Sequence, residues 1–357
     1  MIKKIYVFVY LFIIVSCANN DKRYFDGEIE IVNYPKDLVQ LQGERLILND
    51  VYNGHLSVFD TLIFISSGGR SGYFYKVFNI SGDLIGNYVR RGNGPNEFLM
   101  LSMAKNFYLE DNKLICLIHD PNSGTVAEWN ITASLNSESN YIESSHILKL
   151  SKYETYVFNE ITKINNEKVL ARTMSVETEN GDYFKLPMYI IKDSIQESVF
   201  KPFLRTLPDN ENNIVAPETY FVTQDVISQD GETLASAMLW LEQINFINLH
   251  DGEIKGIRLR DGIDFSDLES HNTLNFCYIS VEADGESIYA LWSGKEFSPM
   301  EGKVDQSGDE IHVFDWRGKF VKRLKLDHPA QEIAYDPVNN ILYANHIDNE
   351  EIHKYKL

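Results

Sequence analysis

The chain has 357 residues, of which 44% are hydrophobic and 24% charged, and its formal net charge at pH 7 is -19. This composition is typical of a globular chain with a sizeable core, and it excludes a disordered or fibrous protein. The acidic excess would repel phosphate backbones, which argues against nucleic acid as a partner and indicates a solvated outer surface.

The first seventeen residues have the pattern of a bacterial lipoprotein export signal. Lys3 and Lys4 give a positive start, residues 5–15 form an unbroken apolar run, and residues 14–17 form a lipobox that ends at Cys17. The apolar run is too short to span a bilayer as a mature helix. We predict that residues 1–17 are a lipoprotein signal peptide with an acylated Cys17; an ordinary cleaved signal is the alternative.

The segment that follows is polar. Residues 18–27 are expected to be a flexible tether between the lipid and a single folded domain over residues 28–357. The lipid anchor makes the membrane a partner and predicts a location in the cell envelope, at the outer membrane. Whether the domain faces the periplasm or the cell surface stays open.

Beyond the tether, short apolar stretches alternate with Asp-Gly, Asn-Gly and Gly-Asp turns, and few segments have a helical period. One kind of unit places a tight polar turn just before an apolar strand, as in residues 111–117, 230–236, 284–290 and 336–344. A second kind joins a strand, a turn and a returning strand, as in residues 77–85, 246–254 and 313–321. The alternation of the two units predicts repeated four-stranded antiparallel sheets.

These repeats predict an all-β fold, namely a six-bladed β-propeller with blades of about 40 to 50 residues. The strand at residues 28–32 has no local partner, and the chain ends in a strand at residues 351–357. We expect this N-terminal strand to join the C-terminal blade and close the ring, which removes exposed edges. A β-sandwich is the structural alternative.

Three segments carry a resemblance to a known family: residues 90–98, 280–292 and 336–344. They resemble the TolB-like six-bladed propeller lipoproteins of Bacteroidetes, and the Gly-x-Gly-Pro-x-Glu-Phe run is similar to the blade junction of NHL repeats. The likeness covers nearly all of the mature chain, although residues 136–213 match the family poorly and share only its general succession of short strands. The resemblance implies a fold and an envelope location, and it supplies no catalytic residues.

The glycine-rich run after residue 91 is predicted to be a structural blade junction. Its residues are Gly92, Gly94, Pro95, Glu97 and Phe98. Glu97 occupies the place of the third glycine of a dinucleotide-binding loop, and no amphipathic helix follows. The glycines allow a sharp reversal, Pro95 stiffens it, and Phe98 can fill the space between neighbouring sheets.

Other motifs for chemistry are missing from the sequence. Residues 66–72 resemble a phosphate loop in composition but lack the Gly-Lys-Ser/Thr ending, so we expect a hairpin tip. No Gly-x-Ser-x-Gly elbow occurs, and the nine histidines have no metal-ligand spacing, so we predict neither metal nor cofactor. Cys116 and Cys277 lie in apolar strands as expected buried thiols, although two exported thiols could also pair.

Two groups of residues are candidates for ligand binding. Arg90 and Arg91 could orient a carboxylate or sulfate on one face of the ring; surface salt bridges are the alternative. Trp292 could stack on a sugar ring if it lines the central pocket, which would make an envelope glycan a partner; packing between blades is the alternative.

We therefore expect a membrane-anchored envelope propeller of unassigned activity that binds or scaffolds a protein or ligand. The alternative is a hydrolase or lyase that acts on sugar or lactone substrates through an axial metal or acidic site. An enzyme should gather carboxylates, Asn and His around one axial cavity, whereas a scaffold should have a dry or featureless channel and a patch on its rim.

Overall fold

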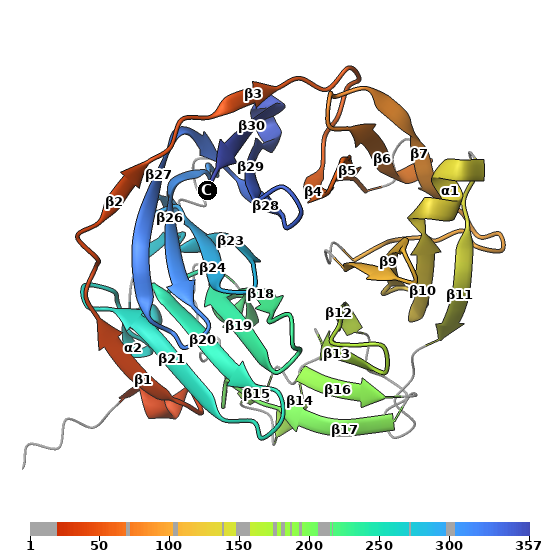
Figure 1. Cartoon of the computed structure of the whole chain (residues 1–357). Helices are drawn as coiled ribbons and strands as arrows, with labels where there is room; N and C mark the ends of the chain where they lie inside the picture. Colours follow the sequence, from red (N-terminus) through yellow and green to blue (C-terminus); the bar gives the residue numbers. More distant parts are fainter. Residues whose placement is uncertain are drawn as a thin grey trace, which may run out of the picture.

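The computed structural model of the chain (Figure 1) describes residues 20–68, 72–102, 106–137, 139–147, 158–173, 177–179, 183–185, 188–192, 195–205, 215, 217–270, 273–297 and 304–357. The predicted signal peptide and Cys17 lie outside the described residues. Within the described part, no helix is both long enough and apolar enough to cross a membrane.

Six antiparallel sheets are arranged as blades around a central axis (Figure 1). Blade 1 contains β4 (His55–Phe59), β5 (Leu62–Ser66), β6 (Tyr73–Asn79) and β7 (Leu84–Arg90). Blade 2 contains β8 (Phe107–Glu110), β9 (Lys113–Asp120), β10 (Thr125–Asn130) and β11 (Ile142–Ile147). Blade 3 contains β12 (Phe158–Lys163), β13 (Lys168–Thr173), β16 (Met188–Lys192) and β17 (Ile195–Phe200).

The second half of the ring has the same pattern. Blade 4 contains β18 (Thr223–Ile227), β19 (Thr233–Met238), β20 (Gln243–Asn248) and β21 (Ile254–Leu259). Blade 5 contains β23 (Tyr278–Ala283), β24 (Ser287–Trp292), β26 (Gly308–Asp315) and β27 (Phe320–Ala330). Blade 6 contains β28 (Glu332–Asp336), β29 (Ile341–His346) and β30 (Glu351–Lys356) and takes its outer strand from the N-terminus.

Short elements decorate the blades. Two small hairpins pair β14 (Glu177–Glu179) with β15 (Tyr183–Lys185) and β22 (Leu274–Asn275) with β25 (Glu296–Phe297). The helices are α1 (Ile131–Ser137), α2 (Phe265–Ser270) and the 3-10 turns η1 (Asn20–Arg23), η2 (Pro217–Phe221) and η3 (Ile347–Asn349). The prediction of a six-bladed, all-β propeller is confirmed, and the sandwich alternative was wrong.

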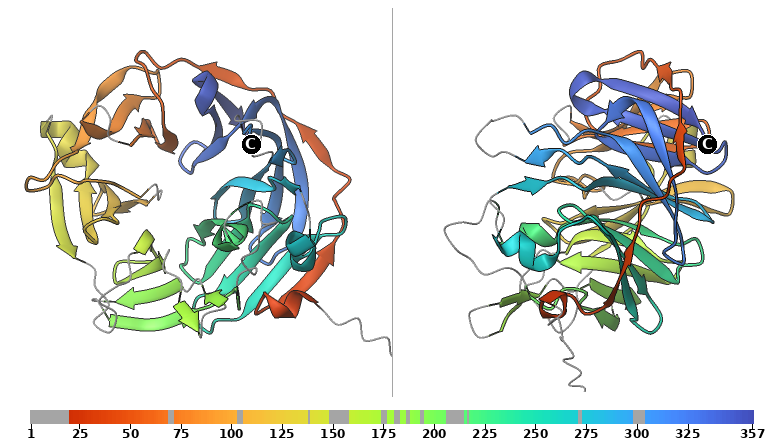
Figure 2. Two further views of the ribbon diagram at one scale, coloured as in Figure 1. Left: turned by 180° about the vertical axis from the view of Figure 1, so that it is seen from behind. Right: turned by 90° about the vertical axis from the view of Figure 1, so that its left-hand side faces the viewer.

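The N-terminal segment runs along the outside of three blades in succession (Figure 2). We call residues 28–46 the N-terminal strap. Its strand β1 (Glu28–Val32) pairs in parallel with β21 of blade 4, and β2 (Leu38–Gln40) pairs in parallel with β27 of blade 5. Its last strand, β3 (Glu44–Leu46), pairs antiparallel with β30 and completes blade 6.

Closure of the ring by an N-terminal strand is therefore confirmed, but the choice of Glu28–Val32 as that strand was wrong. Glu28–Val32 adds a fifth strand to blade 4, and Glu44–Leu46 closes the ring. The reason lies just before the strap, where the chain is already fixed to the outside of blade 4. A strand that starts there can reach blade 6 only after it has passed blade 5.

That fixed segment also corrects the expected tether. Tyr24 and Phe25 are buried, and both pack against Phe265 of α2. Asp21 forms two hydrogen bonds with the guanidinium of Arg258, at 2.9 and 3.0 Å. From Asn20 onward, the residues expected to be a flexible tether thus belong to the folded body.

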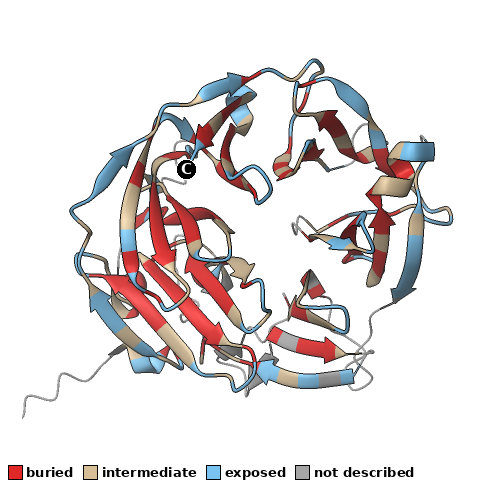
Figure 3. Cartoon of the chain, viewed as in Figure 1, coloured by how far each residue is buried: buried red, intermediate tan, exposed pale blue. Residues whose placement is uncertain are grey.

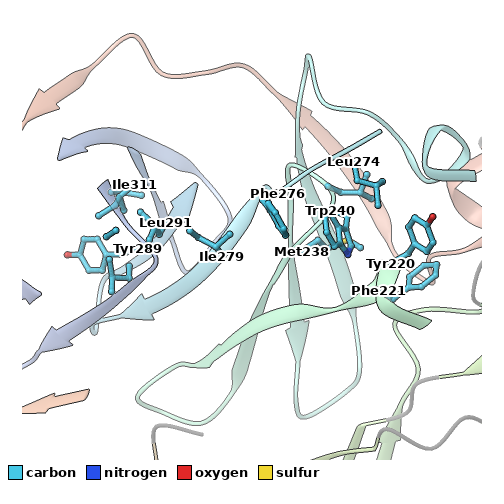
Figure 4. Close-up of a cluster of buried hydrophobic side chains, with 14 of the residues drawn as sticks. Tyr220, Phe221, Met238, Trp240, Leu274, Phe276, Ile279, Tyr289, Leu291 and Ile311 are labelled. Carbon is cyan, nitrogen blue, oxygen red and sulfur yellow. The ribbon is translucent and has the colours of Figure 1, made fainter. Parts of the chain in front are cut away.

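The hydrophobic core consists of clusters between neighbouring blades, as the buried strand faces in Figure 3 indicate. Strand β24 shows how alternation builds it: Ile288 and Ala290 face blade 4, whereas Tyr289 and Leu291 face blade 6. The largest cluster extends from blades 5 and 6 to an aromatic group around Trp240 and Phe276 (Figure 4). Because every blade packs on two neighbours, the packing between blades fixes the width of the space around the axis of the ring.

Candidate ligand-binding channel

The first strand of each blade faces the axis of the ring. Together β4, β8, β12, β18, β23 and β28 line most of a cavity of about 750 Å³. Small-molecule sites in proteins usually enclose about 300–1,000 Å³. The axial channel is therefore large enough for a metabolite-sized ligand, and all six blades build its wall.

The wall of this channel is polar and predominantly acidic. Its carboxylates are Glu160, Asp225, Glu282, Glu332 and Asp348, and its amide side chains are Asn106, Asn165, Asn166, Gln224, Gln306 and Gln331. Lys163 and His55 also line it. A channel of this kind is neither dry nor featureless, since it gathers carboxylates, amides and one histidine around a single axis.

An arginine behind the wall joins blades 3 and 4. Arg172 forms an ion pair with Asp225 and lies 3.7 Å from a carboxylate oxygen of Glu160. Its Nη1 also donates a hydrogen bond of 3.3 Å to the carbonyl oxygen of Thr223. Arg172 neutralises part of the acidic wall and links the innermost strands of two adjacent blades.

A second link joins blades 6 and 1. Glu332 accepts a hydrogen bond of 2.7 Å from the backbone N–H of Leu56, and its other carboxylate oxygen lies 3.4 Å from Nδ1 of His55. Asn345 donates from Nδ2 to the carbonyl oxygen of Gly54 at 3.2 Å. These contacts orient His55 at the cavity wall and hold the two blades where the ring closes.

Blades 2 and 3 are joined by a buried amide. Asn106 donates a hydrogen bond of 2.6 Å from Nδ2 to the carbonyl oxygen of Ile161, and its Oδ1 accepts one of 3.1 Å from the backbone N–H of Lys163. The nitrogen and the oxygen of the Asn106 side chain thus both form hydrogen bonds across the boundary between blades 2 and 3. Polar side chains at the axis therefore hold the blades in register as well as facing the cavity.

The single lysine of the wall is held by an aromatic ring and a carboxylate. Nζ of Lys163 lies 3.3 Å from the centroid of the Tyr108 ring and 3.9 Å from Glu128. Tyr108 donates a hydrogen bond of 2.7 Å to Glu128. Burial lowers the pKa of Lys163, while burial and the bond to Glu128 raise the pKa of Tyr108.

Metal ligands do not converge in the described part of the chain. Among these residues no group of three or more His, Cys, Asp or Glu side chains is placed to hold a metal ion. The five carboxylates named above come from four blades, and Glu332 and Asp225 contact N–H donors of the protein itself.

The two arginines singled out in the sequence lie away from the channel wall. Arg90 ends β7 with its guanidinium 3.8 Å from Glu97, and Arg91 donates a hydrogen bond of 3.4 Å to the carbonyl oxygen of Gly68. Both are exposed. Their binding of an anion stays a prediction.

The glycine-rich run links blade 1 to blade 2. Gly92 donates to the carbonyl oxygen of Phe98, and Phe98 donates to that of Arg90. Gly94 donates a hydrogen bond of 3.0 Å to Glu97, which closes the turn around Pro95. Phe98 is buried in the hydrophobic cluster between the two blades.

Trp292 does not line the channel, so the condition on which its stacking against a sugar ring depended is not met. Its Nε1 donates a hydrogen bond of 3.0 Å to Glu242, and its ring stacks on His312 with 5.7 Å between centroids. The other tryptophans, Trp129, Trp240 and Trp316, do not line the cavity either. Trp292 ends β24, and its ring packs beside the hydrophobic cluster between blades 4 and 5 instead of reaching the axis.

The two remaining cysteines are free and buried, in different hydrophobic clusters, so they do not pair. Burial raises the pKa of Cys116 to about 12 and that of Cys277 well above its ordinary value. Neither thiol is suited to act as a nucleophile near neutral pH.

Comparison with known proteins supports the propeller fold. Residues 210–337 match the family described as TolB-like 6-blade propeller-like. A Bacteroides fragilis protein described as exported has 11% identity over 92% of this chain and 98% of its own, with a TM-score of 0.50. A Bacteroides vulgatus member of the DUF4221 family has 10% identity over 92% and 97%, with a TM-score of 0.55. At these identities the likeness shows only that the two structures and this chain have the same fold. A comparison with curated proteins found no match to the chain. The resemblance to TolB-like six-bladed propellers is confirmed.

Proposed function

We propose that this TolB-like six-bladed propeller is an exported, lipid-anchored protein of the cell envelope, at the outer membrane, that binds a cationic small-molecule ligand in its axial channel. The lipobox at residues 14–17 supports export and anchoring. The description of the Bacteroides fragilis protein as exported agrees with this location.

The observation that carries the ligand proposal is the charge of the channel. Five carboxylates line it, whereas Lys163 is its single lysine and Arg172 lies behind it. A concave wall with one sign of charge concentrates ions of the other sign. The amides and hydroxyls between the carboxylates can orient an amine by hydrogen bonds.

The ligand class is tested by thermal stabilisation of the full chain in detergent, with spermidine as cation, maltose as neutral probe and citrate as anion. We expect spermidine alone to raise the melting temperature, less so at high salt. Glu282→Gln and Asp348→Asn should each weaken spermidine binding about fivefold, on the order of 1 kcal/mol. The matched control is Glu286→Gln, at an exposed turn outside the channel. Equal effects of all three probes, or of all three variants, would contradict the proposal.

The anchor is tested separately by metabolic labelling with a palmitate analogue. The natural chain should incorporate the label and Cys17→Ala should not. Equal labelling of both chains would contradict lipidation at Cys17 and leave the ligand proposal intact.

A second candidate function rests on the pair formed by His55 and Glu332. A carboxylate 3.4 Å from Nδ1 can orient an imidazole as a general base at the cavity wall. If the propeller is a hydrolase or lyase for sugars or lactones, His55→Gln should abolish turnover of a chromogenic glycoside or a lactone while spermidine binding persists. Unchanged turnover in this variant, or none in the natural chain, would rule out this role for His55.

A further inference from the structure

The N-terminal residues are fixed to the outside of the ring where blades 3 and 4 meet. Leu204, just after blade 3, donates a hydrogen bond of 2.7 Å to the carbonyl oxygen of Tyr24, and Asp26 donates one of 3.0 Å to that of Pro202. Phe25 and Phe203 form an isolated β-bridge and pack ring against ring at 6.2 Å. The segment from η1 to Asp26 therefore moves with the propeller.

A buried ion pair strengthens this attachment from the blade 4 side. The side chain of Arg258 on β21 is 3% exposed, and its guanidinium is held by both carboxylate oxygens of Asp21. Separating the pair would leave an arginine buried without its carboxylate, which costs about 3–5 kcal/mol. Fraying of η1 away from the ring is thus strongly disfavoured.

Only Ala18 and Asn19 separate Cys17 from the first residue of η1. Three Cα-to-Cα steps span at most about 10 Å, even in a fully extended chain. A lipid on Cys17 would therefore keep η1 within that distance of the headgroups. A long tether that lets the domain tumble away from the bilayer is incompatible with this spacing.

We propose that the perimeter of the ring around η1, at the boundary of blades 3 and 4, rests against the lipid surface. The proposal depends on the lipidation of Cys17 proposed above. Blade 1 lies across the ring from η1 and would be directed away from the membrane (Figure 1). Lys22 and Arg23 are exposed beside the anchor in an otherwise acidic protein, which suits an anionic headgroup layer.

The test measures the distance of two surface positions from lipid. The acylated full chain is reconstituted in vesicles of phosphatidylethanolamine and phosphatidylglycerol that carry a headgroup-linked quencher. One fluorophore is attached at Asp26→Cys, next to η1, and another, in a separate variant, at Ser81→Cys on blade 1; both positions are exposed. Since Cys116 and Cys277 are buried, the chain without an added cysteine serves as the labelling blank.

We expect quenching at least threefold stronger at position 26 than at position 81. Inserting twenty Gly and Ser residues between Ala18 and Asn19 should abolish the difference, because such a linker spans about 25 Å on average and frees the body. An acylated chain with equal quenching at both positions, or a difference that survives the insertion, overturns this inference alone. A natural chain that takes up no palmitate analogue overturns lipidation and the inference with it.

Discussion

His119 on β9 is a buried histidine with 2% of its surface exposed, and neither ring nitrogen has a hydrogen-bond partner among the described residues. Burial lowers its pKa to about 4, against an opposing effect of Asp120. In the unfolded chain the pKa of histidine is about 6.5. Between these values the unfolded chain binds a proton that the folded chain does not, so the folded state loses stability as the pH falls from about 6.5 to about 4.

Replacing this histidine should therefore reduce the acid sensitivity of the fold. For His119→Leu we expect the change in free energy of unfolding between pH 7 and pH 5 to be about 2 kcal/mol smaller than for the natural chain. Urea denaturation at the two pH values measures it. The control His250→Leu, at an exposed turn, should keep the full change. Because His312 and His353, whose pKa values are also lowered by burial, are present in all three chains, their contribution cancels. Parallel pH profiles for His119→Leu and the natural chain would refute this explanation.

At the scale of elements, the segment just after the strap meets the turn between β6 and β7. Gly82 in that turn has φ of +93°, and a Cβ there would lie 1.9 Å from the carbonyl oxygen of Ile47. Asn49 donates a hydrogen bond of 2.8 Å to the carbonyl oxygen of Gly82. Close backbone approach at this glycine thus joins the strap to blade 1.

Gly82→Ala should lower the free energy of unfolding by about 3 kcal/mol or more, since backbone strain and a backbone clash add up. The matched control is Gly72→Ala, where φ is +85° and, among the described residues other than its chain neighbours, no atom lies within 4 Å of the added Cβ. That variant carries the conformational strain without the clash, and we expect a loss of about 1 kcal/mol. Chemical denaturation compares them; equal losses would show that the close approach to Ile47 is unimportant.

The predicted repeat units correspond to two kinds of hairpin within the blades, and blades 4 and 5 contain both kinds. The turns at 111–112, 230–231, 284–285 and 337–340 join first and second strands, and those before β7, β21 and β27 join third and fourth strands. Asp111 and Asn112 both have positive φ, 48° and 61°, as the hairpin twist requires. Local turn chemistry was enough to predict these hairpins because each is encoded within about a dozen residues, whereas blade 3 contains none of the predicted units.

The path of the strap could not be predicted in the same way. Its three short strands pair with segments more than two hundred residues away, and the contact that places the first of them is the long-range pair of Asp21 and Arg258. Residues 19–23 are all polar, and the aromatic pair Tyr24 and Phe25 that follows does not show which blade it packs on. Tertiary contact alone decides that Glu28–Val32 joins blade 4.

The residues that line the channel were missed for a related reason, although a signal was present. The innermost strand of a blade is the one just before the first-to-second turn, as β18 precedes residues 230–231 and β23 precedes residues 284–285. Asp225 and Glu282 lie on these strands. Polar residues in first strands thus mark the axis, whereas the tryptophans and arginines considered from composition lie elsewhere.

At the scale of the whole molecule, the strap divides the ring into two unlike halves. Strands β21 and β27 are paired on both sides, because β1 and β2 cover their outer edges. Among the described residues, β7, β11 and β17 of blades 1 to 3 are paired on one side only. The outer edges of blades 4 and 5 should therefore open less readily than those of blades 1 to 3.

Amide hydrogen exchange tests this asymmetry directly. Peptides from β7 and β17 should exchange at least tenfold faster than peptides from β21 and β27, since half of the amides of an edge strand point to solvent. Replacing both Glu30 and Ile31 by Pro removes donors from β1 and should raise exchange in β21 to the level of β17 without a change in β7. If β21 already exchanges as fast as β17 in the natural chain, the strap does not protect the edge. The ring would then be held mainly by the clusters between blades.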